Sequence, residues 1–241
     1  MSGHSKWSQI KYKKAIEDAK KAKIFSKFSR LISLAAREKG GDPEKNSQLK
    51  SIIEKAKSFN MPQENIEKAI KRGAGEIEGA KLENFLIEAL GPGGVSILID
   101  VVTDNKNRAL SEIKKILESN NSKMVSGSVI WKFKKLGKIQ GVLKDLNRKE
   151  EFELAAIEGR AEDIKEKKDG VFEVFALPEN LNNLKSKIEE FLDQQEVSIE
   201  FVPNEEISIP KEDLEKLKNL FEKLDENEDV QEIYSDLKEE D

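Results

Sequence analysis

The spacing of the hydrophobic residues changes once along this chain, and that change limits the folds it can adopt. Up to about residue 73 the apolar residues recur at helical intervals, and from residue 82 they alternate as in β-strands. Helices followed by strands that are mixed with further helices indicate the α+β class. At 241 residues the chain can form one large domain or two to three small ones.

Residues 1–80 are predicted to form a small helical bundle. Residues 10–39 contain neither Pro nor Gly and have the pattern of one long amphipathic helix that ends at Gly40. Asp42 and Pro43 are expected to cap and begin a second helix, and a third is expected from about Pro62 to Gly73. The predicted apolar face of the first helix consists of Ile24, Phe25, Phe28, Ile32, Ala35 and Ala36.

The remainder of the chain predicts two α/β domains. Strands are expected near residues 85–87, 95–102 and 127–134, with a hairpin turn at 91–94 and a helix from about 105 to 119. Val129, Trp131 and Phe133 alternate in the third of these strands and are expected to face the core. A strand at 207–209, a helix at 211–224 and a strand at 229–236 would complete the same domain.

Between these segments lies a block with the order βαββαβ, which is typical of the ferredoxin-like sandwich. The predicted fold is therefore an N-terminal helical bundle followed by two ferredoxin-like α/β domains, one inserted in the other. The predicted domains are residues 1–80, residues 81–136 plus 203–241, and the inserted residues 137–202. The block's predicted elements are strand 138–144, helix 148–159, strands 163–167 and 171–176, helix 178–193 and strand 197–202.

Charge is distributed unevenly along the chain. Residues 1–80 hold 18 Lys and Arg against 10 Asp and Glu, a net charge of +8, although the whole protein has a net charge of −5. Residues 81–241 therefore carry −13. A basic region on an acidic protein is the asymmetry expected when that region meets a polyanion.

The composition excludes several classes of site. The chain has no Cys and a single His, His4, which excludes disulfides, the commonest zinc ligand sets, the Ser-His-Asp triad and Cys-His nucleophiles. No spacing singles out a catalytic pair among the 47 Asp and Glu, so we expect no catalytic residues, no metal, no cofactor and no small-molecule substrate. No run of about 18 apolar residues and no signal-peptide pattern occurs, so we expect a soluble cytoplasmic protein that does not enter a membrane.

Two further motifs leave their role open. Gly91-Pro92-Gly93-Gly94 lies between strands and lacks phosphate-loop spacing, which favours a hairpin turn. Asp104 to Arg108 is polar and begins a helix, a position that can bind an anion or simply cap the helix. No helix-turn-helix with a recognisable recognition helix emerges, which slightly favours RNA over DNA as a polyanion.

An ordered series of motifs resembles the YebC/PmpR family, which also includes the mitochondrial translational activator of cytochrome c oxidase subunit I. Leu90, residues 122–126 and Arg160 depart from the usual pattern of the family. The matching motifs cover essentially the whole chain: Ser2-Gly3-His4-Ser5-Lys6-Trp7, Ile10-Lys11, Asp18-Ala19-Lys20, Ala35-Ala36-Arg37, Gly40-Gly41-Asp42-Pro43, Ile53 to Lys57, Asn60-Met61-Pro62, Asn65 to Gly73, Gly91 to Val95, Thr103 to Arg108, Gly127-Ser128-Val129, Asp229-Val230-Gln231 and Tyr234.

The resemblance implies a three-domain cytoplasmic regulator of gene expression. Bacterial members are described as DNA-binding transcriptional regulators, and others act in translation on the ribosome or mRNA. Together with the charge pattern this predicts a non-enzymatic protein that binds DNA, or rRNA and mRNA on the ribosome. An acidic protein–protein adaptor that uses residues 225–241 is the alternative, and a carboxylate-based hydrolase is a more remote one. The predicted nucleic-acid contacts are His4, Lys6, Trp7, Lys11, Lys13, Lys14, Lys20, Lys23, Lys27, Arg30 and Arg37.

Overall fold

The computed structural model describes residues 18–78 and 81–238, which divide into two compact units. Residues 132–204 make the inserted unit. Residues 18–131, apart from the two undescribed positions, and residues 205–238 make the other, which we call the main unit. The division of the chain into three domains stays a prediction, since the N-terminal helices share one unit with the first sheet.

The N-terminal helices of the main unit are α2 (Asp18–Lys39), α3 (Ser47–Ser58) and α4 (Gln63–Gly73). The predicted apolar face of α2 is confirmed, since Phe28, Ile32 and two alanines are buried there against residues such as Leu49 and Ile66. Helices α2 and α4 approach so closely that a Cβ added at Gly73 would lie 2.2 Å from the Ser33 carbonyl oxygen. Only glycine fits this position.

The second helix begins four residues later than the sequence indicates. Residues 43–45 form a turn, and Asn46 rather than Asp42 is the N-cap of α3. The Asn46 side chain accepts a hydrogen bond from the Leu49 N–H (3.0 Å) and donates to the carbonyl oxygens of Ala35 (2.9 Å) and Gly40 (2.8 Å). An amide donates and accepts at once, so the buried Asn46 joins the end of α2 to the start of α3, which a carboxylate could not do.

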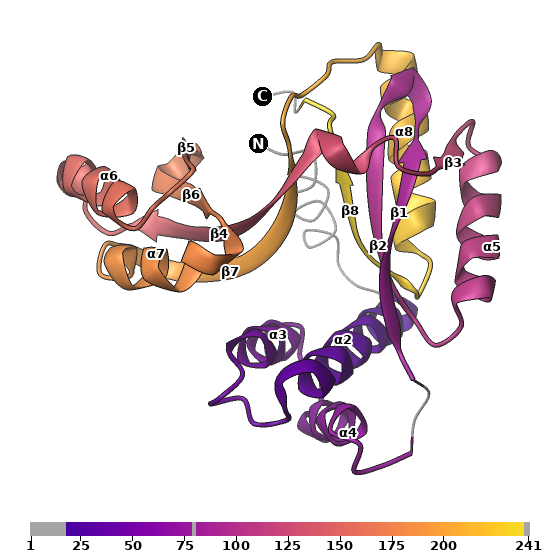
Figure 1. Cartoon of the computed structure of the whole chain (residues 1–241), viewed down its shortest axis with the longest axis horizontal. Helices are drawn as coiled ribbons and strands as arrows, with labels where there is room; N and C mark the ends of the chain where they lie inside the picture. The colour runs from indigo at the N-terminus through magenta and orange to yellow at the C-terminus, as the bar shows by residue number, and fades with distance from the viewer. Residues whose placement is uncertain (1–17, 79–80, 239–241) are drawn as a thin grey trace. The chain divides into compact units, whose positions relative to one another are not determined.

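The main unit also contains a four-stranded antiparallel sheet in the order β3-β1-β2-β8 (Figure 1). Helices α5 (Lys106–Glu118) and α8 (Lys211–Asp225) cover one face of it, with Ile99, Ile113 and Leu220 fully buried between them. The predicted hairpin turn is confirmed, and Gly93 and Gly94 adopt φ of 69° and 79° within it. The strands are β1 (Glu83–Leu90), β2 (Ser96–Thr103), β3 (Lys123–Val125) and β8 (Val230–Ser235).

The inserted unit has the predicted βαββαβ order, and its antiparallel sheet runs β5-β6-β4-β7. The two helices cover one face, where Ile139, Phe152, Phe172 and Leu184 make the core. The second helix is shorter than predicted and the last strand longer, because residues from Leu192 onward pair with β4. The elements are β4 (Phe133–Leu143), α6 (Lys149–Glu158), β5 (Asp163–Glu166), β6 (Val171–Ala176), α7 (Leu181–Ile188) and β7 (Leu192–Pro203).

The two sheets share one arrangement of neighbours, which confirms the predicted fold class. In the main sheet, β2 precedes helix α5 and lies between β8, the last strand, and β1. In the inserted sheet, β4 precedes helix α6 and lies in the same way between β7, the last strand, and β6. The order along the chain differs, because β1 precedes β2 in the main unit whereas β6 follows β4 and β5 in the inserted unit. The main sheet is thus a permuted version of the ferredoxin-like arrangement.

Two predicted strands are wrong. Residues 127–132 form bends and a short 3-10 turn, η2 (Ile130–Lys132), so the alternation of Val129, Trp131 and Phe133 is not that of a strand. Val129 and Phe133 are buried as expected, whereas Trp131 is 67% exposed. Residues 207–209 contribute a single bridge, from Ile207 to Leu237, in place of a strand.

Candidate nucleic-acid interface

The predicted contact residues are only partly within the described structure. His4, Lys6, Trp7, Lys11, Lys13 and Lys14 lie outside the described residues, and Lys20 belongs to the first turn of α2. The structure places the other four, Lys23, Lys27, Arg30 and Arg37, along α2. All four make contacts within the chain itself.

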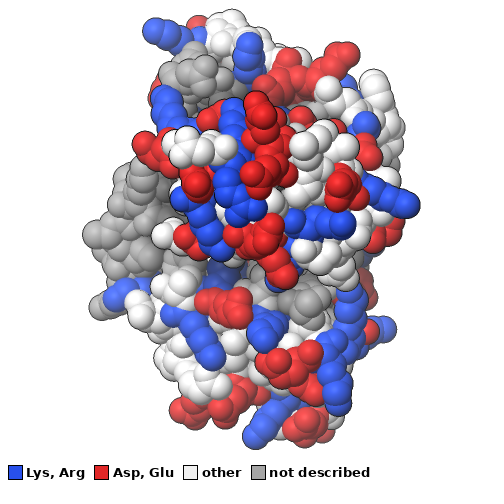
Figure 2. Space-filling view, turned by 90° about the vertical axis from the view of Figure 1, so that its left-hand side faces the viewer, with Lys and Arg blue, Asp and Glu red and all other residues white. Residues whose placement is uncertain are grey.

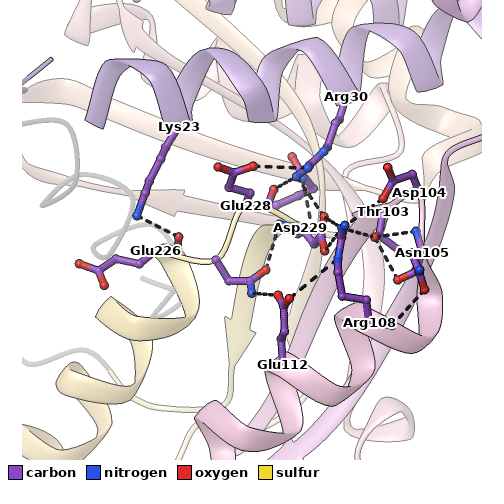
Figure 3. Close-up of polar contacts among 12 residues, drawn as sticks. Lys23, Arg30, Thr103, Asp104, Asn105, Arg108, Glu112, Glu226, Glu228 and Asp229 are labelled. Atoms are coloured by element: carbon purple, nitrogen blue, oxygen red, sulfur yellow. Dashed lines mark hydrogen bonds and ion pairs between the residues drawn. The ribbon is translucent and has the colours of Figure 1, made fainter. Parts of the chain in front are cut away.

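Three of these side chains meet a run of acidic residues in the main unit. We call residues 225–229, which connect α8 to β8, the acidic turn; four of its five residues are Asp or Glu. Figure 3 shows Lys23 and Arg30 extending from α2 toward this turn. The Lys27 Nζ lies 2.9 Å from Asp225 Oδ1 and 2.7 Å from its carbonyl oxygen, and Lys23 donates to the Glu226 carbonyl oxygen at 3.3 Å. The Lys27 side chain is only 9% exposed.

Asp229 is the centre of this contact, because one buried carboxylate holds two arginines. Its side chain is 3% exposed, and its oxygens lie 3.1 Å from Arg30 and 2.9 Å from Arg108. The hydrogen bond from Arg108 and the negative charge of Asp229 raise the pKa of Arg108. Arg30 also donates to the backbone carbonyl oxygen of Glu228. Asp229 therefore joins α2, α5 and the acidic turn.

The polar motif at the start of α5 explains how Arg108 is placed (Figure 3). Asn105 caps α5 by accepting from the Arg108 N–H at 3.1 Å, and Thr103 Oγ1 accepts from the Asn105 N–H at 3.1 Å. Asp104 lies 3.1 Å from the Arg108 guanidinium. These contacts support helix capping and arginine placement for this motif rather than anion binding.

A cleft of about 400 Å³ opens between these groups. The side chains that line the cleft carry charges of both signs, so the cleft is a poor binding site for an anion and for a cation. No three His, Cys, Asp or Glu side chains of residues 18–78 and 81–238 lie close enough together to hold a metal ion. The cleft is lined by Lys23, Arg30, Arg108, Glu112, Glu226, Asn227, Glu228 and Asp229.

The positive side chains without a partner lie elsewhere on the helices. The side chains of Lys39, Lys68, Lys71 and Arg72 are exposed and make no hydrogen bond or ion pair within the described part of the chain; we call them the basic edge. The turn that follows α2 packs against α4, since a Cβ added at Gly41 would lie 3.1 Å from the Ile70 side chain. Arg37, by contrast, donates to the carbonyl oxygen of Leu82.

Sequence reasoning located the basic helix and missed the acids that face it. The signal was present, because residues 225–229 are nearly all acidic, but a local pattern does not show which distant segment a charged run will contact. On the face drawn in Figure 2, Lys and Arg alternate with Asp and Glu without a continuous area of either sign. None of the described helices is long and apolar enough to cross a bilayer.

The chain combines a basic N-terminal helical region with two four-stranded sheets of ferredoxin-like arrangement, which makes it an α+β protein with a cationic N-terminal region. The chain belongs to the TACO1/YebC family. The model of the family's N-terminal domain matches residues 5–76, and the model of its second and third domains matches residues 82–237. The resemblance found in the sequence motifs is thereby confirmed.

Relatives match over nearly the full length. A probable transcriptional regulatory protein of Caldanaerobacter subterraneus subsp. tengcongensis is 44% identical over 243 residues and covers 100% of both chains. One from Thermotoga maritima is 42% identical over 238 residues, 98% of this chain and 94% of the relative. The crystal structure of a conserved hypothetical protein from Aquifex aeolicus superimposes with a TM-score of 0.80 at 36% identity, over 98% of each chain.

Proposed function

We propose that this chain is a non-enzymatic, cytoplasmic regulator of gene expression that binds nucleic acid through the basic residues of positions 1–80. DNA is the first candidate target, because relatives that match over nearly their whole length are named probable transcriptional regulatory proteins. The structural observation that carries the proposal is the basic edge of α2 and α4. Exposed cations without an internal partner are available to neutralise phosphates and release their counterions.

The connection between α3 and α4 supports DNA. These helices are separated by four residues, which is the connection length of a helix-turn-helix, although the sequence alone revealed no recognition helix. Lys68, Lys71 and Arg72 stand three and four positions apart and therefore share one side of α4. They lie toward the end of α4, while Glu64 lies in its first turn, so contacts to phosphates fit better than contacts to base edges.

The N-terminal residues extend the same surface in this proposal. Lys6, Lys11, Lys13, Lys14 and Lys20 would add phosphate contacts, with His4 and Trp7 reaching bases. Lys23 is exposed, and it would contact a phosphate by giving up its hydrogen bond to the Glu226 carbonyl oxygen. Lys27 and Arg30 reach it only if phosphate replaces the acidic turn, and Arg37 only if its bond to Leu82 is released.

The salt dependence of binding tests this proposal. Binding of the full chain to a duplex DNA is measured between about 50 and 200 mM salt, for the unchanged protein and for Lys68→Gln/Lys71→Gln/Arg72→Gln. We expect the slope of log K against log salt to fall by roughly one for each phosphate contact removed. The control variant with the same charge change is Lys115→Gln/Lys185→Gln/Lys211→Gln. It removes exposed lysines from α5, α7 and α8, and we expect it to keep the salt slope of the unchanged protein.

An equal slope in both triple variants would contradict the role of the basic edge. A Lys11→Gln/Lys13→Gln/Lys14→Gln variant then asks whether the N-terminal residues supply the contacts instead. If neither set changes the slope, and the unchanged protein binds no nucleic acid, the proposal as a whole is wrong and the acidic adaptor becomes the better hypothesis.

The second candidate target is RNA on the ribosome, and the exposed Trp131 favours it, because exposed aromatic rings stack on unpaired bases. Sedimentation of a tagged full-length protein through a gradient of cell lysate separates the two targets. Migration with ribosomal particles that is lost when residues 1–20 are removed supports RNA. Migration away from ribosomes, together with duplex binding at physiological salt, supports DNA.

A further inference from the structure

Helix α6 of the inserted unit is apolar on two opposite sides. Phe152 and Ala156 are fully buried in the core of that unit, whereas Leu154 and Ile157 are 62% and 64% exposed. Helices on the surface of a globular domain ordinarily carry polar side chains on the side that faces away from the core. The two exposed apolar side chains have no part in the core and need another explanation.

The exposed pair forms one short apolar ridge along α6. Successive residues of an α-helix are turned by about 100°, so residues three apart lie on the same side of the helix, one turn from each other. Leu154 and Ile157 have this spacing, and they lie on the side opposite to the buried Phe152 and Ala156. An apolar ridge of this kind is the surface by which one helix packs into the groove between the side chains of another helix.

Glutamates surround this ridge. Glu150 lies on the line of the ridge, one turn before Leu154. Glu153 lies to one side of that line, and Glu151 and Glu158 lie to the other. The Glu150 side chain is exposed and makes no hydrogen bond or ion pair within the described residues. The ridge is therefore an apolar strip with a negatively charged border.

The cations near α6 do not reverse the charge of this border. The helix itself contains four Glu and one Lys, which leaves it a net charge of −3. Three cations on or beside α6 each pair with an acidic side chain of the same unit, and such exposed pairs are weak enough to exchange for a new partner. The pairs are Arg148 with Glu151 (2.8 Å), Lys149 with Glu166 (2.6 Å) and Lys187 with Glu158 (3.2 Å).

We propose that the apolar ridge of α6 binds a basic amphipathic helix of a partner protein. The partner's apolar side chains would pack on Leu154 and Ile157, and its Lys or Arg side chains would contact the glutamates of the border. An amphipathic helix with anchors three and four residues apart matches the spacing of the exposed pair. The opposite charge of the border adds attraction and fixes the register of the two helices. This inference goes beyond the proposed function and does not depend on nucleic-acid binding.

The charge of the border decides against the other occupants of an apolar ridge. Nucleic acids and anionic lipid headgroups are negatively charged, so the glutamates repel both. In a symmetric pair of two copies of this chain the same surface meets itself, and glutamates would face glutamates. A partner of opposite charge satisfies both the apolar ridge and its border.

Binding of a defined peptide to the full-length protein tests the proposal. The probe, which we call the Lys peptide, is a fluorescein-labelled helix of about 14 residues made only of Leu and Lys, with its leucines three and four positions apart. Fluorescence anisotropy measures its affinity. We expect binding at about 50 mM salt that weakens toward 200 mM as the charges are screened. The Glu peptide, in which every Lys is replaced by Glu, should bind at least roughly 10-fold more weakly.

Variants of the ridge give the size of the effect. Leu154→Ala/Ile157→Ala should weaken binding of the Lys peptide roughly 10- to 50-fold, because apolar anchors at the centre of an interface supply most of its binding energy. The matched control is Leu177→Ala/Ile199→Ala, which removes the same two side-chain types from other exposed positions of the inserted unit and should leave the affinity unchanged. Circular dichroism checks that both variants keep the native fold.

The charge of the border is tested separately. Glu150→Gln should weaken binding of the Lys peptide roughly 2- to 5-fold at about 50 mM salt, and the difference should shrink toward 200 mM. Its control is Glu179→Gln, which removes an exposed glutamate of the same unit that also makes no hydrogen bond or ion pair within the described residues. An equal effect of the two substitutions contradicts the proposed basic character of the partner.

Several results would overturn the inference. Two of them are absence of binding of the Lys peptide to the unchanged protein, and equal affinity of that protein and Leu154→Ala/Ile157→Ala for it. A dimer in analytical ultracentrifugation that is lost in this variant shows a second copy on the ridge, which also overturns the inference. So does co-sedimentation with phosphatidylcholine–phosphatidylglycerol vesicles that the variant loses. Each of these results leaves the proposed function standing, because the basic residues of positions 1–80 are unchanged in the variant.

Discussion

Glu88 shows how one residue determines the shape of a loop. Partial burial alone would raise the pKa of Glu88, but hydrogen bonds from the backbone N–H groups of the 127–130 loop outweigh it and lower the pKa from its ordinary value of 4.5. These bonds form all together only while the carboxylate is charged and accepts at both oxygens. The loop and the exposed Trp131 therefore depend on the ionisation of Glu88.

Replacing this carboxylate by an amide should destabilise the protein in a pH-dependent way. Glu88→Gln puts a donor opposite backbone donors, and we expect it to lower the free energy of unfolding by about 1 kcal/mol at pH 7, since solvent screens part of the effect. Because the folded-state pKa is lowered, the advantage of the wild type is complete above pH 4.5 and lost as the pH falls through the folded-state value. Urea denaturation from pH 7 to 3 measures this difference.

The control for Glu88→Gln is Glu83→Gln on the same strand. Glu83 is exposed and its side chain makes no hydrogen bond or ion pair within the described residues, so its replacement should leave stability nearly unchanged across the same pH range. A stability difference between Glu88→Gln and the wild type that stays constant down to pH 3 would contradict the role of the ionised carboxylate.

At the scale of whole elements, the ends of α4 and α6 are built in the same way from different residues. In each case the second residue after the helix takes positive φ, Gly75 at 78° and Arg160 at 65°. The next N–H then bonds back into the helix, Glu76 to Lys71 at 2.9 Å and Ala161 to Ala156 at 2.9 Å. This is the Schellman ending, in which glycine is the usual residue because a Cβ is strained at positive φ.

Exchanging the two residue types should therefore change stability in opposite directions. We expect Arg160→Gly to raise the free energy of unfolding by about 1 kcal/mol, because it relieves the strained φ and the Arg160 side chain makes no hydrogen bond or ion pair within the described residues. Gly75→Arg should lower it by about 1–2 kcal/mol, although the position has open space around it. Denaturant titration of both variants and the wild type gives the comparison; shifts of the same sign would refute the common ending.

Most elements followed from hydrophobic spacing, and the errors share a cause. The end of the long α2, the order of elements in the βαββαβ block and the bounds of α8 followed from strong periodic patterns, while the predicted start of the first helix near residue 10 lies outside the described residues. Asn46 was missed as a cap because its advantage over Asp42 lies in bonds to the distant Ala35 and Gly40. The 127–132 loop was read as a strand because its alternation is real, while the loop is made by Glu88, some forty residues earlier. Tertiary contacts decided each of these cases.

At the scale of the whole molecule, the candidate site was only half predictable. The excess of positive charge in residues 1–80 is visible in the sequence. The pairing of Lys27 with Asp225, and of Arg30 with Asp229, links positions about two hundred residues apart, and no local pattern indicates such a pair. The acidic residues therefore do more than repel a polyanion, since they occupy part of the surface that would bind it.

The last prediction follows from this competition. Glu226 and Glu228 line the cleft beside Lys23 and Arg30, and the 55% exposed Glu228 lies 3.6 Å from the Arg30 guanidinium. Arg30 keeps its closer ion pair with Asp229, at 3.1 Å, when both glutamates are neutralised. We expect Glu226→Gln/Glu228→Gln to tighten binding of a duplex or single-stranded oligonucleotide several-fold at about 50 mM salt, because local repulsion is removed and phosphate meets less competition. The gain should shrink toward 200 mM salt as screening increases.

A variant with the same net charge separates local competition from a general effect. Glu118→Gln/Glu215→Gln also removes two negative charges, but from the end of α5 and the first half of α8, far along each helix from the acidic turn. If both double variants tighten binding equally, only the net charge of the protein matters and the acidic turn has no special role. A larger gain in affinity for the Glu226/Glu228 variant locates the competition at α2. Asp229 is unchanged in this variant and still holds α2 through its ion pair with Arg30.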